Sequence, residues 1–386
     1  MKILITGAKG FVGKNLIETL KTQGEHTLYE YDVDSDITAL QEFTKDCEFV
    51  FHLAGVNRPE NTEDFMKGNF GFTSTLLDYL RLNNNNAPIL ITSSTQAALA
   101  NPYGESKRAG EDLIFEYGQT NGIQTFVYRL PNVFGKWSRP NYNSAVATFC
   151  YNIARDIPIQ VNNRDTLLNL VYIDDVVGEF IQALQGNEYR EDVCETEVEE
   201  SFITRIGKSK FGSIKTTHAV TLGQVVDLLY SFKDSRKSLD VPFLADEFTS
   251  ALYATYLSFL PEDQFSYPLK MNVDSRGSFT EFIKTPERGQ VSINISRPGI
   301  TKGNHWHHTK NEKFLVVSGT GVIRFRKIGS DDIIDYFVSG EKLEVVDIPT
   351  GYTHNIENLG DGDMVTVMWA SEAFDPGKPD TFYLEV

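Results

Sequence analysis

The pattern of the sequence changes near its middle, and this change points to two domains of different class. Over about the first 185 residues, apolar strand-like runs alternate with segments of helical apolar spacing, which predicts βαβ units and a parallel sheet. Beyond Pro268 the helical spacing disappears, and short β-rich runs recur at roughly ten-residue intervals, as in an all-β barrel or sandwich. We therefore expect an α/β domain over residues 1–250 and an all-β domain over residues 251–386.

The same periodicities predict individual elements. Strands are expected at residues 2–6, 27–31, 48–53, 89–92, 125–130, 290–295, 313–317, 322–326, 333–338, 342–348 and 364–370. Helices are expected at residues 11–21, 70–82, 106–117, 222–233 and 248–260. From residue 188 to 218 the charge is acidic and then mixed without a period, which predicts a solvated loop or insertion.

Composition narrows the classes of function. The 386 residues carry 53 acidic and 36 basic side chains, and the resulting net charge of −17 argues against a nucleic-acid partner. Cys47, Cys150 and Cys194 form no CxxC pair, so neither a disulfide framework nor a thiolate zinc site is expected. No apolar run approaches the ~20 residues of a membrane span, and the N-terminus lacks signal-peptide features. These features predict a cytoplasmic protein with no membrane partner.

A glycine-rich turn separates the first expected strand from the first expected helix. Glycines in this context permit a tight turn and a close approach of the backbone to a pyrophosphate, which the helix N-terminus binds through free N–H groups. The predicted cofactor-binding residues of this turn are Gly7, Lys9, Gly10, Phe11, Val12 and Gly13. Asp32, at the end of the next strand, either accepts a hydrogen bond from a ribose 2′-hydroxyl or is a turn residue of the acidic run 32–36.

Tyr103 and Lys107 have the YxxxK spacing, which places them on one face of a helix. A nearby ammonium lowers the pKa of a phenol and allows it to exchange a proton near neutral pH. Ser94, at the end of the preceding strand, has a hydroxyl that can hydrogen-bond a substrate carbonyl. Alone, the spacing also fits a solvated helix face; together with the glycine turn, it favours a hydride-transfer site.

These residues resemble the extended short-chain dehydrogenase/reductase family, in its nucleotide-sugar branch, over roughly residues 1–240. Further matching positions are 52–55, Asn69, Thr73, Leu76, Leu77, 129–135 and 171–176. The resemblance implies a Rossmann-type doubly wound parallel sheet, a Ser94–Tyr103–Lys107 catalytic triad and a proton donated by Tyr103. It also implies cofactor contacts by Leu53, Ala54, Gly55, Tyr103, Lys107 and Arg129, and a substrate contact by Asn132. The gap from Ser94 to Tyr103 is short for this branch, so we expect a trimmed loop there.

Three histidines and one glutamate in the C-terminal part have the spacing of metal ligands. His305 and His307 would point to the same face of a strand, Glu312 would follow on the next turn or strand, and His354 is the fourth candidate. Three imidazoles and a carboxylate suit Zn²⁺ or another divalent transition metal.

The spacing G-x5-H-x-H-x4-E-x6-G, followed by P-x-G-x2-H-x3-N, resembles the two cupin motifs. This resemblance implies a jelly-roll β-barrel and the ligand set His305, His307, Glu312 and His354. Residues 274–279 resemble the opening of the dTDP-4-dehydrorhamnose 3,5-epimerase branch of the cupins. Arg276 would then contact a substrate diphosphate, or form a structural ion pair with Asp274.

Almost the entire chain resembles capsular polysaccharide biosynthesis enzymes that join these two domains. A ketone at C4 of a sugar acidifies the C3 hydrogen, so epimerisation and hydride reduction are consecutive steps. The resemblance implies C3 epimerisation of a UDP-4-keto-6-deoxy-HexNAc by the zinc cupin. Reduction at C4 would follow, giving UDP-2-acetamido-2,6-dideoxy-L-talose on the route to UDP-L-FucNAc. A homodimer and NADPH are implied too.

Several alternatives stay open on sequence alone. Asp32 favours NADH, whereas Lys9 offers a charge for the 2′-phosphate of NADPH. The candidates for the epimerase acid and base are Tyr352, His305 and Lys313. Tyr352 is also expected to bind substrate. The chain is alternatively a 4-keto-sugar reductase whose cupin only binds or dimerises, or a nucleotide-sensing regulator on a reductase fold.

Overall fold

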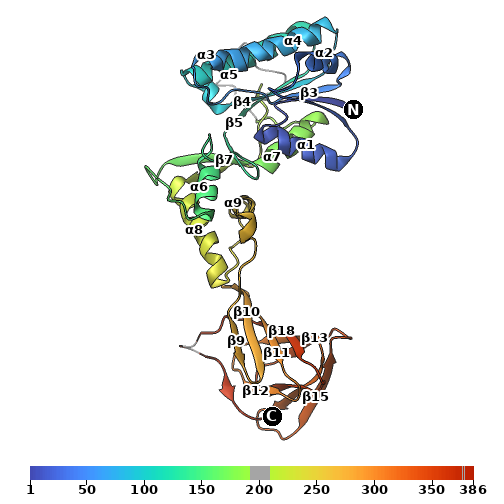
Figure 1. The fold of residues 1–386 in the computed structure, drawn as a ribbon, viewed down its shortest axis with the longest axis vertical. Helices are drawn as coiled ribbons and strands as arrows, with labels where there is room; N and C mark the ends of the chain where they lie inside the picture. Colours follow the sequence, from blue (N-terminus) through green and yellow to red (C-terminus); the bar gives the residue numbers. More distant parts are fainter. Residues whose placement is uncertain (192–208, 376, 378) are drawn as a thin grey trace. The chain divides into compact units, whose positions relative to one another are not determined.

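The computed structural model describes residues 1–191, 209–375, 377 and 379–386. It divides the chain into two compact units, one made of Met1–Leu229 and Ala245–Pro261 and the other of Tyr230–Leu244 and Glu262–Val386 (Figure 1). We call these unit 1 and unit 2. The predicted domain limits, 1–250 and 251–386, stay a prediction.

Unit 1 contains the predicted parallel sheet; its five strands lie in the order β2-β1-β3-β4-β5. The strands are β1 (Lys2–Thr6), β2 (Thr27–Tyr31), β3 (Phe49–His52), β4 (Ile89–Ser94) and β5 (Thr125–Leu130). These strands contribute side chains to the core on both faces of the sheet, because successive side chains in a strand point to opposite sides. Ile3 and Ile5 of β1 belong to one apolar cluster, whereas Leu4 belongs to another.

Helices cover both faces of this sheet (Figure 1). The helices α1 (Phe11–Gln23) and α7 (Ile173–Leu184) pack on one face, and α2 (Ile37–Asp46), α4 (Phe72–Leu82) and α5 (Pro102–Asn121) pack on the other. A short helix α3 (Glu63–Phe65) and a π-helical turn (Met66–Gly71) precede α4, and a 3-10 turn (Thr95–Ala98) precedes α5. The remaining helices are α6 (Ala145–Ala154), α8 (Leu222–Ser238), α9 (Glu247–Ser258) and a 3-10 turn at Glu262–Gln264.

The ends of α5 explain why this helix is longer than the predicted 106–117. The side chain of Asn101 accepts a hydrogen bond from the Gly104 N–H at 2.8 Å, and Pro102 occupies the first turn. Gly122 ends the helix in the left-handed conformation, with φ of +66°. Tyr103 therefore lies in the first turn of α5.

The sequence patterns did not single out α2, α6 or α7. They also missed a second, three-stranded sheet in unit 1, with β6 (Asn132–Phe134), β7 (Leu167–Tyr172) and β8 (His218–Thr221). Of the predicted acidic loop, residues 192–208, including Cys194, lie outside the described residues. Cys47 and Cys150 are free and buried.

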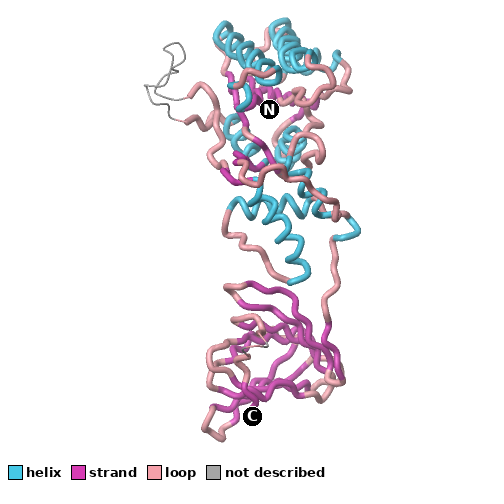
Figure 2. Tube along the Cα trace, turned by 90° about the vertical axis from the view of Figure 1, so that its left-hand side faces the viewer, coloured by secondary structure: helices cyan, strands magenta, loops and turns pink. Residues whose placement is uncertain are grey.

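Apart from the C-terminal part of α8 and the 3-10 turn at Glu262–Gln264, the regular structure of unit 2 is β-strand (Figure 2). One sheet has six strands in the order β16-β13-β18-β11-β10-β9, and the other has five in the order β15-β14-β17-β12-β19. The bounds are β9 (Met271–Asp274), β10 (Gly277–Thr285), β11 (Gly289–Ser296), β12 (Thr301–Trp306), β13 (Glu312–Ser318), β14 (Thr320–Lys327), β15 (Ile333–Ser339), β16 (Val345–Ile348), β17 (Tyr352–Asn358), β18 (Met364–Ala370) and β19 (Phe382–Tyr383).

The pairings between these strands are antiparallel, which confirms the all-β prediction for the C-terminal region. Closure into a jelly-roll barrel stays a prediction. The strand expected at 342–348 begins only at Val345, because Lys342 forms a tight turn with Ser339. Within the described chain, no helix is both long and apolar enough to cross a bilayer.

Candidate active sites

The glycine turn after β1 has the shape that a dinucleotide cradle requires. Gly7 has φ of +71°, and a methyl group added there would lie 2.7 Å from the backbone nitrogen of Ala54. A methyl group added at Gly13 would lie 2.2 Å from the carbonyl oxygen of Gly7. The Gly10 N–H closes the turn by donating to that oxygen at 3.0 Å. The turn therefore leaves no room for a side chain at Gly7 or Gly13, and the start of α1 that follows it offers backbone N–H groups that suit a pyrophosphate.

Asp32 and Lys9 both lie at this turn. The carboxylate of Asp32 accepts a hydrogen bond from the backbone N–H of Lys9 at 2.7 Å. The ammonium group of Lys9 forms an exposed ion pair with Asp34. Lys9 must therefore leave Asp34 before it can meet another anion.

Ser94 is the last residue of β4, and Tyr103 and Lys107 lie in the first two turns of α5. The Tyr103 hydroxyl donates to the side-chain oxygen of Asn57 at 3.1 Å, while burial raises its pKa and a hydrogen bond with Ser94 opposes that rise. The Lys107 side chain is 8% exposed and donates to the Thr92 carbonyl oxygen at 3.2 Å. Burial lowers the pKa of Lys107 to about 8. This set has the components of a proton-donating site beside the glycine cradle.

Gly55 connects the cradle with the lysine. A methyl group added at Gly55 would lie 2.9 Å from the Lys107 Nζ atom and 3.0 Å from the Asn69 side-chain oxygen. Gly55 therefore lets the segment after β3 lie close to Lys107 of α5, where the family resemblance expects a cofactor contact.

A buried polar network, to which the sequence assigned no role, runs beneath these groups. His52 joins Thr6 through Nδ1 at 2.7 Å and Thr73 through Nε2 at 2.8 Å. Asn69, in the π-helical turn, donates to the Ser106 hydroxyl on α5 at 2.9 Å. Burial lowers the pKa of His52 to about 3, so the imidazole is neutral. The network fixes β1, the strand that leads into the glycine turn, and contacts α5, the helix that carries Tyr103 and Lys107.

Arg129 has its guanidinium held by a buried partner. Its Nε and Nη2 atoms donate to the Glu111 carboxylate at 2.8 and 2.6 Å, and Glu111 is only 1% exposed. The guanidinium also lies over the Phe211 ring, 4.1 Å from its centroid. Asn132 is exposed on β6. The cofactor contact of Arg129 and the substrate contact of Asn132 stay predictions.

In unit 2, the four predicted metal ligands meet at one point. The candidate ligand atoms of His305, His307, Glu312 and His354 all lie within 4.8 Å of one another. The Glu312 Oε2 atom is 3.3 Å from the Nε2 atom of His307 and 3.4 Å from that of His354. These three atoms are buried without a hydrogen-bond partner, which is the arrangement a metal ion would satisfy. His307 lies directly after β12, not within a strand shared with His305 as predicted.

The charge state of this cluster also suits a divalent cation. Burial, followed by the neighbouring His354, lowers the pKa of His305 to about 4. Burial acts to raise the pKa of Glu312, but the imidazoles of His307 and His354 beside the carboxylate outweigh it and hold that pKa well below its usual range. Neutral imidazoles and an ionised carboxylate are the forms that bind metals.

A cavity of about 390 Å³ borders this cluster within unit 2. Glu312 and Lys310 line one wall, and the Lys310 ammonium is 3.6 Å from the Glu312 carboxylate. Gln290 and Ser292 of β11 also line the cavity and are buried. These residues were not predicted from the sequence, although polar residues alternate with apolar ones along β11, a pattern that indicates a polar interior face.

The other residues of unit 2 predicted to bind substrate or to act as acid or base do not line this cavity. Arg276 forms an exposed ion pair with Asp274 at 2.7 Å, the structural alternative considered for it. Lys313 is exposed and paired with Asp347; it follows Glu312 directly in β13, so its side chain leaves the opposite face of the sheet. Tyr352 is half-buried at the start of β17, against the core of unit 2. This placement disfavours Lys313 as an epimerase acid or base.

Comparison with known proteins relates both units to nucleotide-sugar enzymes. Residues 3–193 match the NAD dependent epimerase/dehydratase family, and residues 272–382 match the polysaccharide biosynthesis C-terminal domain. The UDP-2-acetamido-2,6-beta-L-arabino-hexul-4-ose reductase of Pseudomonas aeruginosa is 44% identical over 386 residues, covering 100% of this chain and 99% of the relative.

The chain is also similar to solved structures of a capsular polysaccharide protein and of a nucleotide-sugar epimerase. The capsular polysaccharide assembling protein CapF from Staphylococcus aureus has a TM-score of 0.91 and 55% identity, with 100% of both chains covered. UDP-glucuronic acid 4-epimerase from Bacillus cereus in complex with NAD has a TM-score of 0.52 at 17% identity, covering 67% of this chain and 98% of the epimerase. That second likeness extends to the fold alone.

Proposed function

The chain belongs to the family of the capsular polysaccharide assembling protein CapF, and from this premise we propose that it is a bifunctional nucleotide-sugar enzyme. Unit 2 would epimerise C3 of a UDP-4-keto-6-deoxy-HexNAc, and unit 1 would reduce the C4 ketone with NADPH. The product would be UDP-2-acetamido-2,6-dideoxy-L-talose, on the UDP-L-FucNAc route to capsular polysaccharide or O-antigen. The supporting observation is that one chain holds both the Ser94–Tyr103–Lys107 set and a metal-ligand cluster bordering a cavity.

In unit 1, Tyr103 would be the general acid of ketone reduction. A bound nicotinamide supplies the hydride that adds to C4. Tyr103 donates its proton to the carbonyl oxygen, and the buried ammonium of Lys107 stabilises the phenolate that remains. Ser94 holds the carbonyl oxygen by a hydrogen bond. The side-chain oxygen of Asn57 accepts a hydrogen bond from the Tyr103 hydroxyl at 3.1 Å and would orient that hydroxyl before substrate binds.

The cofactor would lie against the glycine turn. Gly7, Gly10 and Gly13 admit the pyrophosphate, since their positions have no room for side chains. We favour NADPH, with Lys9 leaving Asp34 to pair with the 2′-phosphate. NADH is the alternative that Asp32 favours.

In unit 2, the two sheets would form a cupin barrel around the substrate. His305, His307, Glu312 and His354 would hold a Zn²⁺ ion. Such an ion acts as a Lewis acid that stabilises negative charge developing on a carbonyl oxygen. The cavity beside Glu312 would receive the sugar, and Lys310 on its wall would attract the diphosphate or the developing oxyanion. Tyr352 is the candidate for an acid or base that inverts C3, since a His305 that binds the ion no longer has that lone pair to accept a proton.

We also propose a homodimer with a UDP-sugar as substrate. Edge strand β15 exposes apolar side chains, among them Phe337 at 71% and Ile333 at 53%, and edge strand β16 exposes Val345 at 59%. Exposed apolar edges of this kind are sites for pairing with a second copy. Light scattering of the purified chain measures the oligomeric state directly.

The reductase assignment is tested by NADPH oxidation with the UDP-4-keto-6-deoxy-HexNAc substrate. Tyr103→Phe should lower kcat by ~10²–10⁴-fold, the range expected for loss of a general acid. Tyr79→Phe is the matched control, since the Tyr79 hydroxyl accepts a partly buried hydrogen bond from Gln41 at 3.0 Å, between α2 and α4, and the variant should keep the wild-type rate. A Tyr103→Phe variant with the wild-type rate would refute the role of this hydroxyl.

A further inference from the structure

Asp380 holds the loop that leads from β12 to β13. Its carboxylate accepts three consecutive backbone N–H groups, from His308 at 2.9 Å, Thr309 at 2.8 Å and Lys310 at 2.8 Å. The Thr309 hydroxyl donates to the same carboxylate at 3.0 Å. One side chain from the end of the chain therefore fixes three successive residues of a loop that connects two metal-ligand strands.

The backbone of Asp380 also contacts His307, one of the candidate metal-ligating residues. The Nδ1 atom of His307 hydrogen-bonds the carbonyl oxygen of Asp380. A carbonyl only accepts, so Nδ1 carries a proton, and in the neutral ring that binds metals Nε2 then keeps its lone pair. That Nε2 atom is buried without a partner, 3.3 Å from the Glu312 carboxylate. The tautomer and the ring orientation of His307 are thus the ones that metal ligation needs.

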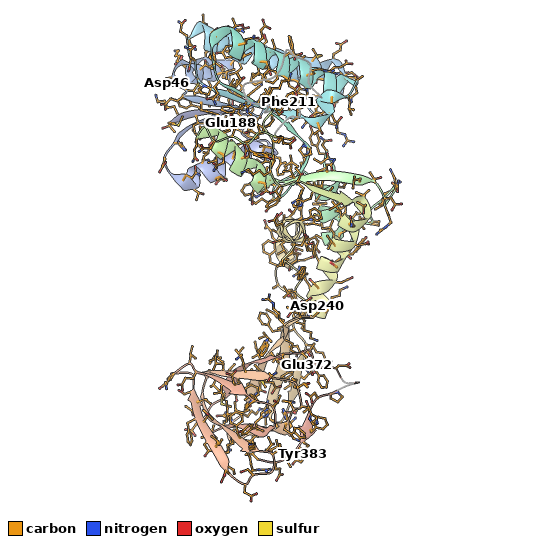
Figure 3. All side chains as sticks on the ribbon, turned by 180° about the vertical axis from the view of Figure 1, so that it is seen from behind. Asp46, Glu188, Phe211, Asp240, Glu372 and Tyr383 are labelled. Carbon is orange, nitrogen blue, oxygen red and sulfur yellow. The ribbon has the colours of Figure 1, made fainter. Side chains whose placement is uncertain are left out.

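Strand pairing brings Asp380 to this position. Phe382 and Tyr383 of β19 pair with Trp306 and His305 of β12, beside the ligands; Tyr383 is labelled in Figure 3. The Thr381 hydroxyl accepts a hydrogen bond from the Lys310 ammonium at 3.1 Å. The same short segment therefore touches both the metal-ligand strand and the cavity wall.

We propose that Asp380 is a positioning residue of the metal centre, which orients His307 for ligation and holds Lys310 at the wall of the cavity. The proposal rests on the metal site proposed above. It differs from a purely structural role for the carboxylate, because a loop cap would stabilise unit 2 without changing metal affinity. Ligand-orienting groups outside the coordination sphere typically change metal affinity by ~10–100-fold.

The test uses the full chain and two metals. Zn²⁺ affinity is measured by competition with a chromophoric chelator, and the d–d absorption of bound Co²⁺ reports the ligand geometry. Asp380→Ala should bind Zn²⁺ ~10–100-fold more weakly than wild type and shift the Co²⁺ spectrum. Asp380→Asn keeps one acceptor oxygen but turns an NH2 group toward the loop N–H donors, so it should be intermediate. If Asp380→Ala does not fold, Asp380→Asn carries the test.

Asn358→Ala is the matched control for lost stability. Asn358 is buried on β17, four residues beyond His354, and its amide donates to the Ser296 and Gly362 carbonyls at 2.8 and 2.9 Å. This control should lower the unfolding temperature and keep the wild-type Zn²⁺ affinity and Co²⁺ spectrum.

The outcomes separate the two proposals. A wild type that binds neither metal refutes the metal site and, with it, the role of Asp380. A wild type that binds both, with an Asp380→Ala variant of unchanged affinity and spectrum, refutes the role of Asp380 alone. Equal loss of affinity in Asp380→Ala and Asn358→Ala also refutes it, because the loss would then reflect general destabilisation.

Discussion

Removal of the metal is expected to destabilise unit 2 strongly. Without an ion, the Nε2 atoms of His307 and His354 and the Oε2 atom of Glu312 are buried without hydrogen bonds. Each such atom costs about 1–3 kcal/mol, so an ion that satisfies all three recovers about 3–9 kcal/mol of the metal-free penalty. The stabilisation that is observed depends on metal concentration; at 100 times Kd it is ~2.7 kcal/mol.

That free energy corresponds to a measurable temperature shift. For a unit of this size, ~1 kcal/mol moves the unfolding temperature by ~3 °C, so saturation with Zn²⁺ should raise it by ~8 °C over the chelator-treated chain. Differential scanning calorimetry of the full chain, with Zn²⁺ and with a chelator, measures this difference.

The control is the double variant His305→Ala/His307→Ala, whose calorimetric transitions should not respond to Zn²⁺. Two results would refute the reasoning. One is a wild type whose transitions stay in place at 100 times the Kd of Zn²⁺. The other is an equal shift in the double variant, which would mean that the ion acts at another site.

Three further predictions concern unit 1. Gly13→Ala forces a methyl group to within 2.2 Å of the Gly7 carbonyl and should weaken NADPH binding at least ~10-fold in a fluorescence titration. Gly178→Ala on α7, where a methyl group would meet nothing within 4 Å, should leave binding unchanged and stabilise the chain by ~0.5–1 kcal/mol; equal effects of the two changes would contradict the cradle. Because burial lowers the pKa of Lys107 to about 8, its ammonium is lost as the pH rises through 8, and kcat/KM for reduction should fall toward tenfold per pH unit above it; a flat profile to pH ~10 would disprove this. Burial lowers the pKa of His52 to about 3, so below its ordinary value of ~6.5 the unfolded chain binds a proton that the folded chain does not, and stability falls as the pH falls. By pH 5 this loss should reach ~2 kcal/mol in urea unfolding and be absent from His52→Asn, and the same pH dependence in both proteins would exclude His52 as its source.

Local patterns were sufficient to predict much of the fold. The strands at Lys2–Thr6, Thr27–Tyr31 and Thr125–Leu130 were predicted to the residue, because each is a short run rich in β-branched or aromatic residues that alternates with segments of helical spacing. The glycine turn was predictable for the same reason, since its chemistry is contained in seven consecutive residues. The metal ligands were found because three of the four lie within eight residues.

What sequence patterns missed depends on contacts between distant segments. Asp380 lies 73 residues from His307, and nothing near it in the sequence indicates the loop that it holds. Arg129 has a motif that suggests a ligand contact, yet Glu111 on α5 holds its guanidinium. No motif in the sequence distinguishes Lys310 from the other lysines, and only the folded structure shows it at a cavity wall beside Glu312.

The central claim is that unit 2 epimerises C3 before unit 1 reduces C4, and solvent deuterium incorporation tests it most directly. The UDP-4-keto-6-deoxy-HexNAc substrate is incubated in D₂O, and the sugar is analysed by mass spectrometry while NADPH oxidation is followed. Tyr103→Phe should exchange deuterium into C3 without oxidising NADPH, and His305→Ala/His307→Ala should lose that exchange. If the histidine variant instead reduces the same substrate to the same product at the wild-type rate, the chain is a simple reductase and unit 2 only binds or dimerises.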